Sequence, residues 1–449
     1  MDSSLNLMTE GSVWKKIVFF AIPVFIGNLF QQLYNTADSL IVGNFLGSNA
    51  LAAVSSAGNL IFLLIGFFSG LALGAGVVIA RYIGAKDHVN VEIAVHTTVA
   101  LGLVASVIMT AVGVGLAPAI LRLMDTPAEV LPASVTYFRI YFMGAAGFVM
   151  YNTFVGILQA AGDSKHPLYY LIISSVINIV LDLLLIAGFH MGVGAAAFAT
   201  AVSQLVSALL CMIRLMKTKE DYRLVLRRIR FHGPTLGRII RFGLPSGFQN
   251  SIIGFANVVV QSYINYFGEM AMAGAGAYSK IEGFAFLPIT SFTMALTTFV
   301  GQNLGAGDYE RTRKGARFGT ICSLILAELI GVVIYITAPQ LIAAFDRTPQ
   351  VIAYGTDRAR ACALFYCLLA FSHAMASILR GAGKAMVPML IMLAFWCIVR
   401  VSILAVSGML FRTIATVNWV YPITWSLSSV AFLIYYRHFS FEQSEQKKV

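Results

Sequence analysis

Residues 60–80 read LIFLLIGFFSGLALGAGVVIA, and this run contains no charged side chain. A helix needs about 20 apolar residues to cross the roughly 30 Å of hydrocarbon in a bilayer. Residues 97–116, TTVALGLVASVIMTAVGVGL, form a second run of the same kind. The strands of an outer-membrane barrel would instead be short and would alternate between apolar and polar positions. The two runs therefore predict membrane-spanning helices.

The composition of the whole chain agrees with these two runs. Of its 449 residues, 58% are hydrophobic and 11% are charged, whereas soluble domains have about 25% charged residues. The mean hydropathy is +0.80, and about twelve crossings of 20 residues fit into the chain. The five cysteines lie in apolar segments without the spacing of metal ligands. The sequence thus excludes a water-soluble fold and predicts an all-α integral membrane protein without a bound cofactor.

The apolar segments divide into two sets of six. The expected membrane helices are 14–39, 48–72, 92–118, 133–158, 166–188 and 193–214, followed by 238–266, 273–299, 317–338, 355–378, 386–408 and 415–436. The expected domains are an N-terminal bundle (1–216), a polar linker (217–235), a C-terminal bundle (236–437) and a tail (438–449).

Basic residues are unevenly distributed between the expected loops. The net charge of +11 comes from 31 Lys and Arg against 20 Asp and Glu. Most of the basic residues fall on the side of the two termini, with Arg223, Arg227, Arg228 and Arg230 in the linker, while few, Arg358 among them, fall on the opposite side. The positive-inside rule then places both termini and the linker in the cytoplasm. This distribution explains the positive charge without a nucleic-acid partner.

The two halves of the chain repeat each other at a shift of 221 or 222 residues. The dipeptide at 22–23 (IP) matches that at 244–245 (LP), and 158–163 (LQAAGD) matches 379–384 (LRGAGK). Six helices per repeat give both halves the same orientation, so their symmetry axis should run along the membrane normal. Two such bundles facing a central cleft are typical of transporters that work by alternating access.

Polar side chains within the first half predict an ion site. Asp38 lies in the first expected helix, and Asn178 and Asp182 lie one turn apart in the fifth. A buried carboxylate costs roughly 2.5 to 3.5 kcal/mol in insertion experiments, so it needs water, a cation or a partner. No basic residue of this half lies at a similar depth, so the acids must take up a proton or hold a metal ion between oxygen atoms. Thr200 would add a hydroxyl if the sixth helix packs beside the fifth.

These predictions leave structural alternatives open. Asp38 could instead lie at a solvated end of its helix, and the Thr200 hydroxyl could bond back to its own helix.

The second half does not copy this chemistry. The position of Asp38 falls at Val259 or Val260, and that of Asp182 falls at Ile403 or Leu404. Charged residues occur elsewhere in this half, and they form either structural pairs, such as Glu282 with Arg400, or part of a substrate cavity. The candidate cavity residues of both halves are Gln31, Tyr34, Asn35, Asn257, Gln261, Lys280, Glu282 and Arg400. For Glu328 and His373 a structural role is favoured.

The order and duplication of these landmarks resemble the multidrug and toxic compound extrusion (MATE) transporters, over residues 13 to 437. The resemblance rests on Pro23 with Asp38, on the loops GAKD (84–87) and GAGD (305–308), and on the repeated segments at 158–167 and 379–388. It is closest to the bacterial branch with its ion chemistry in the N-terminal bundle. It therefore implies an ion site at Asp38, Asn178, Asp182 and Thr200, and a metal site there only if the ion is Na⁺.

The expected function is a secondary antiporter, not an enzyme, that exports cationic or amphipathic drugs in exchange for H⁺ or Na⁺. It would be a monomer in the bacterial cytoplasmic membrane, with small organic molecules and the lipid bilayer as its partners. A flippase for lipid-linked oligosaccharides is the alternative, although phosphate-bearing substrates would favour a more basic cavity. A channel would need no duplicated bundle, and the sequence has no HExxH motif or serine elbow of a membrane enzyme.

Overall fold

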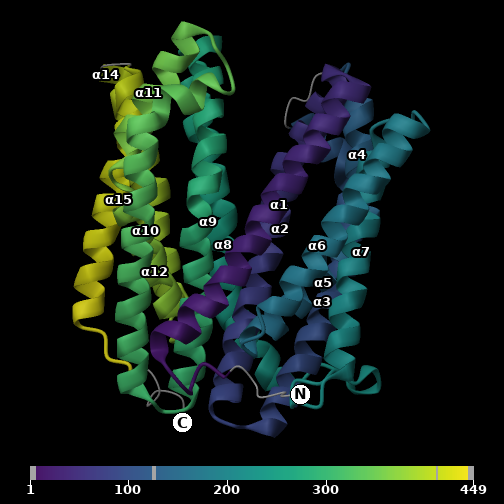
Figure 1. Cartoon of the computed structure of the whole chain (residues 1–449), viewed down its shortest axis with the longest axis vertical. Helices are drawn as coiled ribbons and strands as arrows, with labels where there is room; N and C mark the ends of the chain where they lie inside the picture. Colours follow the sequence, from purple (N-terminus) through teal and green to yellow (C-terminus); the bar gives the residue numbers. More distant parts are fainter. Residues whose placement is uncertain (1–6, 124–127, 411–412, 443–449) are drawn as a thin grey trace. The chain divides into compact units, whose positions relative to one another are not determined.

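The computed structural model describes residues 7–123, 128–410 and 413–442, and the part of the tail from 443 to 449 lies outside them. Every element of regular secondary structure in these described residues is a helix, as the apolar runs predicted (Figure 1). The elements are α1 (Val13–Leu46), α2 (Ser48–Gly84), α3 (His88–Leu123), α4 (Leu131–Met143), α5 (Ala145–Ala160), α6 (Lys165–Asp182), η1 (Leu183–Gly188), α7 (Gly194–Lys217), η2 (Leu226–Arg228), α8 (Gly233–Asn265), α9 (Glu269–Gly305), α10 (Tyr309–Ala343), α11 (Pro349–Ala363), α12 (Tyr366–Gly381), α13 (Met386–Met392), η3 (Leu393–Val399), α14 (Arg400–Leu410) and α15 (Ile414–Arg437).

The helices are long and apolar enough to make this a membrane protein. Within the described residues nine helices can cross a bilayer, and two bent helix pairs raise the number to eleven. The expected span at 238–266 corresponds to α8, which is not among them. Its interior contains Gln249, Asn250, Asn257 and Gln261, which lower its hydropathy. The predicted all-α membrane fold is confirmed.

Both halves contain a helix pair bent at the same place in the repeat. The bend is 49° between α4 and α5 and 54° between α11 and α12. At the first bend a Cβ atom on Gly144 would lie 2.3 Å from the Cβ of Ala201, so a glycine is needed there. At the second bend Glu328 Oε2 accepts a hydrogen bond of 3.1 Å from the backbone N–H of Cys367, in the first turn of α12. A carboxylate stabilises this end of a helix, which gives Glu328 a structural role.

Each half also contains one π-helical segment, but at a different place. η1 follows Asp182 directly, whereas η3 ends immediately before Arg400. A π turn adds a residue to the helix and changes which side chains face a neighbouring helix, and such turns are frequent at functional sites. The two segments therefore shift the register of the fifth helix differently in the two halves.

The chain forms two compact units, and each unit takes in the leading part of one helix from the other half of the sequence. Unit 1 comprises Met1–Leu7 and Ile26–Gly247, and unit 2 comprises Met8–Phe25 and Phe248–Val449. The limits of the units fall close to Pro23 in α1 and Pro245 in α8, which occupy equivalent positions in the repeat. The domain limits expected from the sequence, 1–216 and 236–437, kept both helices whole.

Local contacts explain how each leading segment joins its unit. In unit 2, Phe20, Ala21 and Val24 of α1 pack in one apolar cluster with Phe292 and Phe299 of α9. The segment before α1 is also held by polar contacts, since Met8 N–H donates to Gln302 Oε1 over 2.8 Å. Arg311 donates to the carbonyl oxygens of residues 8, 10 and 11.

In unit 1, glycines allow backbone to approach backbone. A Cβ on Gly70 or on Gly74 of α2 would lie 2.2 Å from the backbone nitrogen of Gly247 or Gly243 of α8. Such close packing of small residues is a common way for membrane helices to associate.

Candidate functional site

Three helices of unit 1 bring the four predicted ion-site residues together. Asp38 comes from α1, Asn178 and Asp182 come from α6, and Thr200 comes from α7. Asp38 is 8% exposed, Asn178 1% and Asp182 0%, so Asp38 does not lie at a solvated helix end. Asn178 Nδ2 donates to Thr200 Oγ1 over 3.4 Å. Helices α6 and α7 are packed together, as the proposed contribution of Thr200 required.

Four oxygen atoms of this site have no hydrogen-bond donor among the described residues. Asp38 Oδ1, Asn178 Oδ1 and both carboxylate oxygens of Asp182 are buried and unpartnered in the described part of the chain. No Lys or Arg of that part lies within 4.0 Å of either carboxylate. An unsatisfied buried polar group costs about 1–3 kcal/mol, and a charged one costs more. The site is therefore an acidic cluster that a small cation would stabilise.

The two carboxyl groups are close enough to act together. Asp38 and Asp182 interact directly, and one can hydrogen-bond to the other when one of them carries a proton. Two carboxylates that share a site cannot both ionise cheaply, so they share a proton or take up a cation. Their arrangement allows either ion to bind.

Two more side chains belong to this site and were missed in the sequence. Gln204 Nε2 donates to the Tyr34 hydroxyl over 3.4 Å, and Tyr137 of α4 lies near both aspartates. Gln204 follows Thr200 by one helical turn, and this i, i+4 spacing was a signal that could have found it. Tyr137 carries no such signal, because an isolated tyrosine in an apolar helix is most often a packing residue.

The residues predicted for a substrate cavity have diverse surroundings. In unit 1 Gln31 is half-buried, Tyr34 is buried and Asn35 is exposed. In unit 2 Asn257, Gln261 and Lys280 are exposed, Glu282 is half-buried and Arg400 is 2% exposed. Their participation in one cavity stays a prediction.

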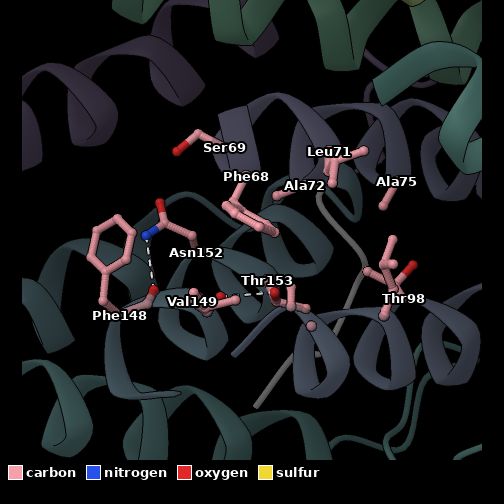
Figure 2. A pocket seen from close by; sticks show the side chains of 13 residues that line it. Phe68, Ser69, Leu71, Ala72, Ala75, Thr98, Phe148, Val149, Asn152 and Thr153 are labelled. Atoms are coloured by element: carbon pink, nitrogen blue, oxygen red, sulfur yellow. Dashed lines mark hydrogen bonds between the residues drawn. The ribbon is translucent and has the colours of Figure 1, made fainter. Parts of the chain in front are cut away.

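A separate hollow lies within unit 1, between α2, α3 and α5. Its empty volume is about 390 Å³, which includes space open to the surroundings, and Figure 2 shows the side chains that line it. Most of them are apolar, such as Phe68 and Val149. The polar ones are partly satisfied by their own helix, since Asn152 donates to the carbonyl of Phe148 and Thr153 donates to that of Val149. None of the predicted site residues lines this hollow.

The family of the chain follows from comparison with known proteins. The profile of the MatE family matches residues 23–184 and 245–432, which is most of both halves. The chain belongs to the MATE family. It is therefore a multi-pass membrane transporter and not an enzyme, and the transporters of this family use ion coupling.

Individual MATE relatives match this chain over most of their length. The "Probable multidrug resistance protein YoeA" of Bacillus subtilis is 29% identical over 96% of this chain and 94% of its own length. The "Multidrug export protein MepA" of Staphylococcus aureus strain N315 is 24% identical over 80% of this chain and 77% of its own length.

Solved structures show the same fold. A MOP superfamily transporter from Pyrococcus furiosus Vc1, described as having a binding pocket of reverse polarity that suggests a different function, matches with a TM-score of 0.92 and 25% identity over 100% of both chains. A multidrug resistance MATE transporter in an outward-facing conformation matches with a TM-score of 0.90 and 24% identity over 99% of both chains.

Proposed function

We propose that this chain is a secondary antiporter that exports cationic or amphipathic organic compounds in exchange for H⁺ or Na⁺. The observation that carries the proposal is the cluster of unpartnered buried oxygens at Asp38, Asn178 and Asp182. The names of relatives such as the probable multidrug resistance protein YoeA and the multidrug export protein MepA support drug export.

Binding of the coupling ion would act through helix packing. The site joins α1, α6 and α7, and a bound ion would neutralise repulsion between Asp38 and Asp182 that otherwise pushes α1 from α6. An ion can shift a conformational equilibrium only by its difference in affinity for the two states. The conformation with these carboxylates closest together is the one that the ion would favour.

Either ion has ligands of the right chemistry. A proton would be shared between the two carboxyl groups. Na⁺ is a hard cation that binds oxygen atoms, and here it would have the two carboxylates, Asn178 Oδ1 and the Thr200 hydroxyl. Among the described residues no group of three or more His, Cys, Asp and Glu side chains could hold a metal, so a multivalent metal is not proposed.

The remaining features of the proposal concern orientation and substrate. The chain would be a monomer in a bacterial cytoplasmic membrane, with both termini and the linker in the cytoplasm. Fluorescence of a green fluorescent protein fused to the C-terminus would test that orientation, and activity of alkaline phosphatase fused there would contradict it. Substrate would bind at the predicted cavity residues of the two units.

The decisive experiment is efflux of a fluorescent organic cation from reconstituted vesicles under separately imposed H⁺ and Na⁺ gradients. One gradient should drive transport, and Asp38→Asn or Asp182→Asn should abolish it while the protein still inserts. Asp357→Asn, at an exposed position of α11, is the matched control and should transport normally. Transport by Asp38→Asn at the full rate would exclude the proposed ion site, and failure of both gradients would favour a lipid flippase.

A further inference from the structure

The C-terminal unit contains a pair of buried arginines. Arg358 of α11 is 5% exposed and Arg400 of α14 is 2% exposed. Both face the ring of Tyr421 in α15, with guanidinium carbons 5.1 and 4.2 Å from its centre. The two guanidinium carbons are therefore no farther apart than the sum of these two distances. The sequence places Arg358 near the end of the expected helix 355–378, where a charge is most often solvated, but α11 buries it.

The partners of the two arginines are incomplete. Arg400 donates to Thr424 Oγ1 from Nε over 3.4 Å and from Nη2 over 3.0 Å. Arg358 Nε and Nη1 are buried and have no hydrogen-bond partner in the part of the chain that the structure describes. Its guanidinium contacts the Tyr278 ring, 5.7 Å from the centre. Two donors of one always-charged group thus point into the protein unsatisfied.

One carboxylate lies near this pair, but it does not neutralise both arginines. Glu282 interacts with Arg358 and Arg400 through its charge, yet in the described residues it forms no ion pair with either within 4.0 Å. Its Oε1 accepts a hydrogen bond of 3.1 Å from the Tyr278 hydroxyl. With Glu282 ionised, the cluster still has one positive charge in excess.

The internal repeat places this cluster where unit 1 has its ion site. At the shift of 221 or 222 residues, Arg358 corresponds to Tyr137, Arg400 corresponds to Asn178 and Tyr421 corresponds to Thr200. The same part of the fold thus contains unpartnered oxygens in one bundle and unpartnered guanidinium donors in the other. The region of unit 1 that holds the proposed cation site therefore corresponds to a region of unit 2 that holds buried positive charge, although the acids and the arginines occupy different positions of the repeat.

We propose that the C-terminal bundle binds an oxyanion, a carboxylate or phosphate group, between Arg358 and Arg400. The parallel N–H donors of a guanidinium match the two oxygens of such a group. Oxyanion binding would satisfy Arg358 Nε and Nη1 and remove the excess charge. The aromatic rings of Tyr278, Tyr421 and Trp396 around the arginines would also contact the apolar part of an organic acid.

The neighbours of the two arginines are less deeply buried than the arginines themselves. Arg358 and Arg400 are buried, whereas Tyr421 and Glu282 are half-buried. The charge of Glu282 acts on both arginines, so it would oppose an anion that binds between them. The proposal therefore predicts that neutralising Glu282 raises the affinity for the anion.

The experiment is isothermal titration calorimetry on the full chain in lipid nanodiscs, without any ion gradient, with benzoate and inorganic phosphate as probes. At least one should bind, and Arg358→Gln and Arg400→Gln should each weaken binding at least about tenfold, the equivalent of one charged hydrogen bond. Arg360→Gln removes the same charge from an exposed position of α11 and should bind as the unaltered chain does. Glu282→Gln should bind several-fold more tightly.

The outcomes show whether the site binds organic acids or an inorganic oxyanion. Binding of benzoate alone assigns the site to organic acids, and binding of phosphate alone assigns it to an inorganic ion. If Arg358→Gln does not fold, Arg358→Lys keeps the charge but loses the paired donors, and it should still weaken binding. The proposal is overturned if neither probe binds, if the arginine variants bind normally, or if Glu282→Gln weakens binding. Because the measurement uses no gradient, such a failure would leave the ion site in unit 1 unaffected.

Discussion

The two halves of this transporter share their helices and their bends but carry buried charges of opposite sign, at different positions of the repeat. In unit 1, Asp38 and Asp182 are buried without a basic partner, whereas in unit 2 Arg358 and Arg400 outnumber Glu282. Hydrophobic length, helix bends and small residues at contacts are enough to specify the bundle. The charge within each bundle is therefore free to differ, and under the two proposals above that difference would give the halves separate roles.

Exchanging one residue between the halves should have the largest effect. Tyr137→Arg places in unit 1 the residue that unit 2 has at the equivalent position, near Asp38 and Asp182. A permanent cation would then occupy the place of the coupling ion. We expect at least a hundredfold loss of gradient-driven efflux, measured with a fluorescent cation in vesicles.

The control for this exchange is Tyr137→Phe, which keeps the ring and adds no charge. It should retain most of the efflux. Equal losses in both variants would show that packing of the ring, and not charge, matters at this position.

The contact between α2 and α8 in unit 1 should be nearly as sensitive, but in stability. A side chain at Gly70 would meet the backbone of Gly247 at 2.2 Å, so Gly70→Val must push two helices apart. Overpacking of this kind typically costs about 1–3 kcal/mol. We expect a markedly lower thermal unfolding temperature in detergent. Gly237→Val, on an exposed part of α8 with no atom within 4 Å of its Cβ position, should leave this temperature nearly unchanged.

Changes at the two helix bends should have a smaller effect on stability. The α4–α5 and α11–α12 pairs bend by similar angles, but different residues stabilise the two bends. The bend in unit 2 relies on Glu328 and the N–H of Cys367, whereas unit 1 has Val107 at the matching position and relies on Gly144. Glu328→Leu should lower stability by about 1 kcal/mol, since it leaves a part-buried donor unpaired. Val107→Leu should have little effect on the same thermal unfolding curve, and a similar loss in both variants would refute this account of the bend.

The loop after α5 should show the smallest effect, which depends on pH. Burial acts to raise the pKa of Asp163, but the hydrogen bonds and charge of His166, together with the charge of Arg214, outweigh it and lower the pKa below the usual 3.8. A lowered pKa stabilises the fold above pH 3.8, and this contribution is lost as the pH falls through the folded-state pKa.

Asp163→Asn should therefore lower the unfolding temperature by a few degrees at pH 6 and by less at pH 3. Lys384→Gln, at the equivalent loop of unit 2, should not show this dependence. An equal loss from Asp163→Asn at both pH values would contradict the role of its charge.

Some of the site could be predicted from the sequence, because residue type and depth in the membrane define it. Asp38 and Asp182 are acids within apolar runs, and the i, i+4 spacing placed Asn178 beside Asp182. The contribution of Thr200 depended on α6 packing beside α7, which only tertiary structure shows. Arg358 was missed because it lies close to the expected end of its helix, where a charge is most often solvated.

The division of α1 and α8 could not be predicted either. Both are continuous helices in the sequence pattern, and a proline such as Pro23 or Pro245 can bend a helix without showing which neighbours its two parts contact. Which unit each leading segment joins depends on its neighbours, Phe292 and Phe299 in one case and Gly70 and Gly74 in the other. Such long-range contacts leave no periodicity in a single sequence.

The exchange of these leading segments has a consequence for how the chain could be divided. Cutting the polypeptide in the linker would separate residues 233–247 from the bundle that they complete, and would separate residues 8–25 from theirs. Neither fragment would then cover its own apolar surface. An ancestral gene encoding a single repeat on this plan would have produced two interlocked copies, and its duplication would have joined partners that already depended on each other.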